Sequence, residues 1–180
     1  MSTEGFDEFR ARYESLVVTA CEWRAIQANP YTTADDVFAR LARHRSAPSL
    51  RLLYSSLQDA VLHAYTSQAG SQSFLDKMRG VQQELSNRPH DTPREAALRL
   101  AISSLKGTDR DLLQLALWDG LTPSEIAEVR RWEPDTVSTR IVQALGRFAT
   151  LAAKRSIQLD AVELPATFRA LKPGTHTRGE

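Results

Sequence analysis

The stretch TPSEIAEVRRWEPDTVSTRIVQALGRF, residues 122–148, decides the fold because it contains two helix starts separated by a short break. Thr122 precedes Pro123, and Glu125 follows at the position that completes a capping box. After a short turn, Pro134 starts a second and longer helix. Two helices so close in sequence have the proportions of a helix-turn-helix.

The second helix of this pair, residues 134–148, has two faces at about 100° per residue. Apolar side chains cluster on one side: Val137, Ile141, Ala144, Leu145 and Phe148. Hydrogen-bonding and cationic side chains cluster on the other: Thr136, Thr139, Arg140, Gln143 and Arg147. Side chains of these types contact phosphates and base edges in the major groove. The pattern predicts a DNA-reading helix in which the arginines bind guanine or phosphate and the glutamine pairs with adenine. The alternative is the solvated face of an ordinary surface helix.

Almost every other patterned segment also has helical period, so the sequence predicts an all-α fold. One amphipathic helix spans Phe6 to Cys21. A second starts at Thr33, with Asp36 at the capping-box position, and a third starts near Ser49. These helices predict a small domain over residues 1–66.

The polar stretch TSQAGSQS then begins a predicted linker, residues 67–94, which has room for one short helix over Phe74–Leu85. A second helical domain is expected over residues 95–155. Within it, Thr108 and Asp111 open a helix, and Gly120 occupies a left-handed C-cap position. Residues 156–180 are expected to form a solvated C-terminal tail, in which LPATFRAL makes at most one or two helical turns.

Composition excludes several classes of protein. Hydrophobic residues make up 42% of the chain and charged residues 25%, which is typical of a chain that buries a core. No stretch approaches the roughly 20 apolar residues of a membrane-spanning helix, and MSTEGFDEFR does not resemble a secretory signal. We therefore expect a cytoplasmic protein without membrane insertion.

The sequence also lacks the patterns of an enzyme. The single cysteine, Cys21, permits no internal disulfide and is expected to be a small buried side chain. The four histidines lack metal-ligand spacing, and no phosphate-binding loop or nucleophile motif occurs. We expect no catalytic residue, no metal and no cofactor.

Charge is distributed unevenly along a chain whose net charge is only +1. Between residues 136 and 159 the basic side chains Arg140, Arg147, Lys154 and Arg155 occur without any acidic residue. Such a segment on a nearly neutral chain indicates a face for an anionic partner.

These motifs and their spacing resemble those of a known family. Residues 105–148, from LKGTDRD to ALGRF, resemble domain four of bacterial extracytoplasmic-function (ECF) sigma factors. The shared layout is a Leu-rich helix, an aromatic before Gly-Leu, and then SEIAEV and TVSTRI. In the first half, DDVFARL at 35–41 and SLRLLYSSLQDAVLHAY at 49–65 resemble a diverged domain two.

The resemblance implies an alternative sigma factor that binds RNA polymerase core and directs initiation at particular promoters. Domain two would bind the polymerase clamp and open the minus-ten element, and domain four would bind the minus-thirty-five element. An anti-sigma factor would be the usual regulator. Carried over to this chain, Asp35, Asp36 and Arg40 fall in the polymerase-binding helix, where Phe38 is better explained as core. Thr136, Thr139, Arg140, Gln143 and Arg147 fall in the recognition helix.

The chain departs from the family at several positions. TSQAGSQS stands in place of an arginine run, Arg131 in place of the glycine of the turn, and Glu133 in place of its serine N-cap. Two alternatives therefore remain: a helix-turn-helix regulator that does not direct initiation, similar to LuxR-type regulators, and a sigma look-alike that occupies polymerase or an anti-sigma factor without reading DNA.

Overall fold

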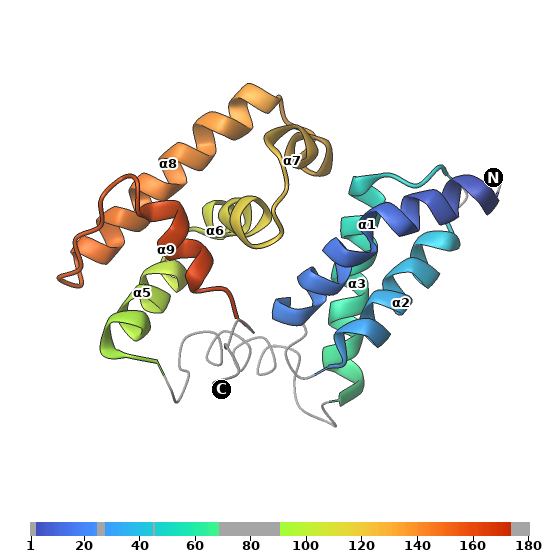
Figure 1. The fold of residues 1–180 in the computed structure, drawn as a ribbon, viewed down its shortest axis with the longest axis horizontal. Helices are drawn as coiled ribbons and strands as arrows, with labels where there is room; N and C mark the ends of the chain where they lie inside the picture. The colour runs from blue at the N-terminus through green and yellow to red at the C-terminus, as the bar shows by residue number, and fades with distance from the viewer. Residues whose placement is uncertain (1–2, 25–27, 45, 69–90, 174–180) are drawn as a thin grey trace. The chain divides into compact units, whose positions relative to one another are not determined.

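The computed structural model describes residues 3–24, 28–44, 46–68 and 91–173, and Figure 1 shows their arrangement into helices. Every regular element in these ranges is helical, which confirms the all-α prediction. By their internal contacts, Met1–Gln72 with Glu128–Arg130 form one compact unit, and Ser73–Ala127 with Arg131–Glu180 form another. The linker helix predicted over Phe74–Leu85 lies outside the described residues.

The first unit contains α1 (Thr3–Arg24), α2 (Pro30–Ala42) and α3 (Leu50–Gln68). Helix α2 packs against both of the others. The core consists of apolar side chains of these three helices, and its fully buried members include Val17, Cys21, Val37, Phe38, Leu53 and Leu57. Cys21 is therefore a core side chain, as expected.

The start of α2 differs from the prediction. The helix begins three residues before the predicted Thr33, because Asn29 is its N-cap and accepts the backbone N–H groups of Tyr31 and Thr32 at 2.9 and 3.2 Å. Asparagine is as good a cap as threonine, and Pro30 suits the first helical position. Thr33 lies inside the helix, where its hydroxyl donates to the Asn29 carbonyl.

The second unit contains α5 (Pro93–Ser103), α6 (Gly107–Leu113), a π-helical turn η1 (Gln114–Trp118), α7 (Pro123–Arg130) as far as Ala127, α8 (Pro134–Ala153) and α9 (Leu164–Ala170). A complete capping box between Thr92 and Glu95 starts α5. The helix predicted to open at Thr108 with Asp111 is α6, which starts one residue earlier, at Gly107, without a side-chain cap. Gly120 has a positive φ of 77°, which confirms the predicted left-handed position.

The C-terminal segment differs most from expectation. Leu164, Phe168 and Leu171 are buried, and the Phe168 ring contacts Trp118 and Phe148 at centroid distances of 5.3 and 5.4 Å. The Trp118 indole N–H donates to the Phe168 carbonyl at 2.8 Å. Apolar residues every three or four positions bury one side of α9, so this segment completes the core of the second unit instead of forming a solvated tail.

Buried Arg99 of α5 also holds the C-terminal segment in place. Its guanidinium donates to the Asp91 carboxylate at 2.6 Å and to the Leu171 carbonyl at 2.7 Å. A buried cation with both a counter-charge and a carbonyl acceptor is satisfied, so it links the start of α5 to the end of α9.

Candidate nucleic-acid interface

Helix α7 begins and ends with local motifs. At its start, the Thr122 hydroxyl accepts the Glu125 N–H at 3.3 Å, and the Glu125 carboxylate accepts the Thr122 N–H at 2.8 Å. At its end, Arg131 adopts the left-handed conformation with φ 57° and ψ 46°. Trp132 N–H then donates to the Ala127 carbonyl at 3.0 Å, which closes the helix in a Schellman-type turn.

The sequence at this turn contains no glycine, yet the turn keeps its left-handed residue. An L-residue in this conformation costs about 1 kcal/mol. The hydrogen bond from Trp132 and the immediate start of α8 at Pro134 hold Arg131 there. The turn is therefore retained, at the expense of local strain, and α8 follows α7 after residues 131–133.

Helix α8 has the predicted buried and exposed faces. Val137, Ala144 and Phe148 are fully buried, and Ile141 and Leu145 are half-buried. The predicted binding side chains are all exposed: Thr136, Thr139, Arg140, Gln143 and Arg147. The apolar side of α8 therefore packs in the core, and its hydroxyl, amide and guanidinium groups face solvent.

Thr139 and Arg140 have neighbours within the protein. The Thr139 hydroxyl donates to the Asp135 carbonyl at 3.0 Å, and its oxygen keeps acceptor capacity toward solvent. The Arg140 guanidinium lies over the Trp132 ring, 4.4 Å from its centroid. This cation–π contact orients Arg140 and leaves the edge of the guanidinium available for hydrogen bonds.

Arg147 is the predicted residue whose surroundings differ most from expectation. Its guanidinium donates two hydrogen bonds to the Asp109 carboxylate of α6, at 2.7 and 2.9 Å. The Arg147 side chain is 46% exposed and that of Asp109 only 13%. A fork-to-fork pair of this kind is the strong form of an ion pair, so any phosphate that binds Arg147 competes with Asp109.

The residues predicted to bind polymerase lie on α2, and each has an ionic partner within the first unit. Arg10 of α1 donates to Asp35 at 2.7 Å, and Arg40 donates to Asp36 at 2.9 Å. The hydrogen bonds of Arg10 with Glu14 and then with Asp35 raise the pKa of its guanidinium. Phe38 is 1% exposed, which confirms that it belongs to the core.

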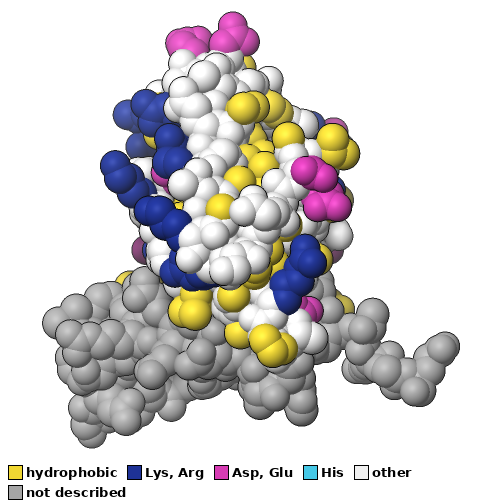
Figure 2. Space-filling model, turned by 90° about the vertical axis from the view of Figure 1, so that its left-hand side faces the viewer, with side chains coloured by type: hydrophobic (Ala, Val, Ile, Leu, Met, Phe, Trp, Pro, Cys, Tyr) yellow, Lys and Arg dark blue, Asp and Glu magenta, His cyan; other side chains and the backbone are white. Residues whose placement is uncertain are grey.

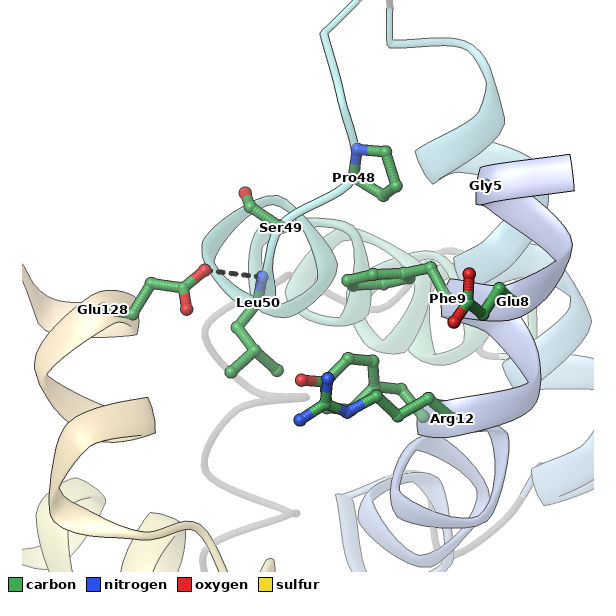
Figure 3. A pocket seen from close by; sticks show the side chains of 9 residues that line it. Gly5, Glu8, Phe9, Arg12, Pro48, Ser49, Leu50 and Glu128 are labelled. Carbon is green, nitrogen blue, oxygen red and sulfur yellow. Dashed lines mark hydrogen bonds between the residues drawn. The ribbon is translucent and has the colours of Figure 1, made fainter. Parts of the chain in front are cut away.

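The first unit also has a surface hollow between α1 and the start of α3. Figure 3 shows Phe9 and Arg12 of α1 on one side and Pro48 and Leu50 on the other. Ser49 also lines this hollow, and its hydroxyl accepts the Leu52 N–H at 3.4 Å and so helps to start α3. We assign no chemistry to this hollow.

Among the described residues, no group of three or more His, Cys, Asp or Glu side chains could hold a metal ion. Over the same residues, none of the helices combines the length and apolar character needed to cross a membrane.

Comparison with known proteins adds no relative: no protein-family model, no curated protein and no solved structure matches this chain.

Two residues of this surface were missed by sequence reasoning. Asp109 reaches Arg147 across 38 positions of chain, and no local pattern signals such a pair. Trp132 was treated only as part of the turn, although an aromatic eight residues before an arginine on the adjoining helix offers a cation–π partner. Both residues restrain arginines that were predicted to bind DNA.

Proposed function

We propose that this chain binds double-stranded DNA through α7 and α8, used as a helix-turn-helix, and acts as a sigma factor that brings RNA polymerase core to particular promoters. The observation that carries the DNA-binding part is the exposed face of α8. Thr136, Arg140 and Gln143 project from a helix whose opposite side is locked in the core by Val137 and Phe148.

The dimensions of α8 suit this role. A helix of 20 residues is about 30 Å long, and the major groove is about 12 Å wide and admits one α-helix. The amide of Gln143 offers the donor and acceptor pair that adenine requires, and the guanidinium of Arg140 matches guanine. The hydroxyl of Thr136 serves bases or phosphates.

The polymerase-binding part rests on the resemblance of the first unit to sigma domain two. Asp35 is exposed on α2, and Asp36 and Arg40 are half-buried beside it. Asp35 forms an ion pair with Arg10, and Asp36 forms one with Arg40. These pairs hold the charged groups in fixed positions, which favours recognition of a partner with a complementary charge pattern. An anti-sigma factor would compete for the same surfaces.

A regulator that binds DNA without directing initiation is the second candidate function. The same ion pairs favour it, because Asp35 and Asp36 already have arginine partners and present less free negative charge to polymerase. In that case the first unit is a scaffold for the second.

Run-off transcription with purified core polymerase on a genomic promoter library tests both candidates. The sigma-factor proposal expects new start sites that depend on the protein and share two spaced sequence elements. Gln143→Ala should change which promoters are used, whereas Gln158→Ala, an exposed glutamine outside α8, should not. DNA binding without core binding would replace the proposal with the regulator, and core binding without new transcripts would replace it with the look-alike.

A further inference from the structure

One side of the second unit carries a row of cations that extends the proposed reading face, Thr136, Arg140 and Gln143, toward the C-terminal end of α8. Arg140, Arg147 and Lys154 lie at intervals of seven residues, which is close to two helical turns, so they follow one side of α8. Figure 2 shows most of the visible Lys and Arg side chains along one edge of this part of the molecule; Asp and Glu side chains lie at its top and, together with further Lys or Arg side chains, near the opposite edge.

Helix α6 and the residues before it extend this row. Arg155 donates to the Ser104 hydroxyl at 2.9 Å, and Arg147 pairs with Asp109, so the start of α6 lies against the C-terminal half of α8. Lys106 is exposed at the N-cap of α6, and Arg110 donates to the Ser103 carbonyl at 3.3 Å. We call these five cations the basic flank: Lys106, Arg110, Arg147, Lys154 and Arg155.

We propose that the basic flank binds the phosphate backbone of the same DNA duplex that α8 reads, and that Asp109 is its internal competitor. This inference rests on the proposed function and adds a second contact to it. Because α8 is about 30 Å long and the major groove about 12 Å wide, the C-terminal half of the helix extends past the groove and over the backbone.

The charge pattern supports phosphate as the ligand. The flank combines arginine forks with lysine point charges, the two side chains that bind phosphate most often. Double-stranded DNA carries one negative charge per roughly 1.7 Å of its axis, so a row of this length meets several phosphates whatever the sequence. The flank therefore supplies affinity, and the reading face supplies sequence preference.

Asp109 limits that affinity. Its carboxylate is mostly buried and is held against Arg147 by two hydrogen bonds, so the arginine must exchange one anion for another when DNA binds. Asp109→Asn keeps a hydrogen-bond acceptor of the same shape and removes the charge. Arg147 is then released toward phosphate without a change in the fold.

Binding of the full chain to duplexes of about 30 base pairs, measured over a range of salt concentrations, tests the proposal. One pool has random sequence, and a second duplex carries the sequence enriched from that pool by selection. The double variant Lys106→Gln, Lys154→Gln should reduce the slope of log affinity against log salt by about 1.8, at about 0.9 per phosphate contact, on both DNAs. The control Arg94→Gln, Arg169→Gln changes the net charge equally at two exposed positions outside the flank.

Asp109→Asn tests the competitor. It should tighten binding about two- to fivefold, the range of a partly exposed ion pair, and leave the salt slope unchanged, because Arg147 contacts the same phosphate with or without Asp109. Glu163→Gln removes the same charge from an exposed position outside the flank and should change neither. Unchanged or weaker binding by Asp109→Asn would overturn the role of Asp109.

The outcomes separate the flank from the proposed function. Equal slopes for the flank and control double variants, with sequence preference still lost in Gln143→Ala, would overturn the flank and leave the DNA-reading helix in place. A reduced slope in the flank variant without any enriched sequence would support the flank and overturn promoter reading. Absence of duplex binding even at low salt would overturn both.

Discussion

Replacing Phe168 tests whether the C-terminal segment belongs to the core of the second unit. The Phe168 side chain is 0% exposed and packs against Trp118 and Phe148. Removing a buried phenyl ring costs about 3–5 kcal/mol, because apolar contacts are lost and a cavity remains. We expect Phe168→Ala to lower the free energy of unfolding of this unit by about 4 kcal/mol, a large part of the roughly 5–15 kcal/mol available to a domain.

Urea unfolding of the full chain, followed by tryptophan fluorescence, measures this loss, since Trp118 lies beside the deleted ring. With a slope of about 2 kcal/mol per molar urea, the midpoint should fall by about 2 M. Val162→Ala is the control, because that side chain is 90% exposed and precedes the same helix. Its expected effect is within about 0.5 kcal/mol. If Phe168→Ala costs no more than Val162→Ala, the segment does not pack on Trp118 and the argument is refuted.

Three further substitutions test the turn, the cap and the first unit. Arg131→Gly should raise the free energy of unfolding in urea by about 1 kcal/mol, because glycine adopts the left-handed conformation without strain. A loss of stability would show that residue 131 is not left-handed. Thr122→Ala should lower the free energy of unfolding by about 1 kcal/mol, because the capping box is lost. Thr122→Ser should keep most of this stability, because serine can form the same hydrogen bonds. Asp36→Lys should weaken capture of core polymerase and leave DNA binding unchanged. The control is Asp59→Lys, at an exposed position on α3. Equal capture of core polymerase by both variants would count against polymerase docking on α2.

Features that depend on neighbours in the chain could be predicted from the sequence. The buried and exposed faces of α8 follow from helical periodicity, since Val137 and Phe148 lie on one side and Gln143 on the other at about 100° per residue. The box of Thr122 with Glu125 and the left-handed Gly120 are likewise set within a few residues. These features carry the proposed reading face.

Features that depend on distant residues were missed. The π-helical turn at Gln114–Trp118 has no sequence signal, and it ends where the Trp118 indole bonds to the Phe168 carbonyl, 50 positions away. The same contact holds the C-terminal segment, which was expected to be a solvated tail, in the core. The Asn29 cap was missed for a different reason: Thr33 and Asp36 also fit a capping box, and two valid local patterns competed for one helix start.

The internal partners of the arginines bear on how such a helix would bind DNA. Arg140 lies on Trp132, and Arg147 is held by Asp109, so both guanidiniums are oriented before a ligand arrives. Orientation lowers the side-chain entropy lost on binding, but the ion pair also makes phosphate displace a carboxylate. The first effect raises affinity for every duplex and the second lowers it. The base contacts proposed for Gln143 involve neither effect, because its amide is uncharged. If α8 binds DNA as proposed, we therefore expect Arg147 to contribute less to affinity than Arg140, whose partner is an aromatic ring without a competing negative charge.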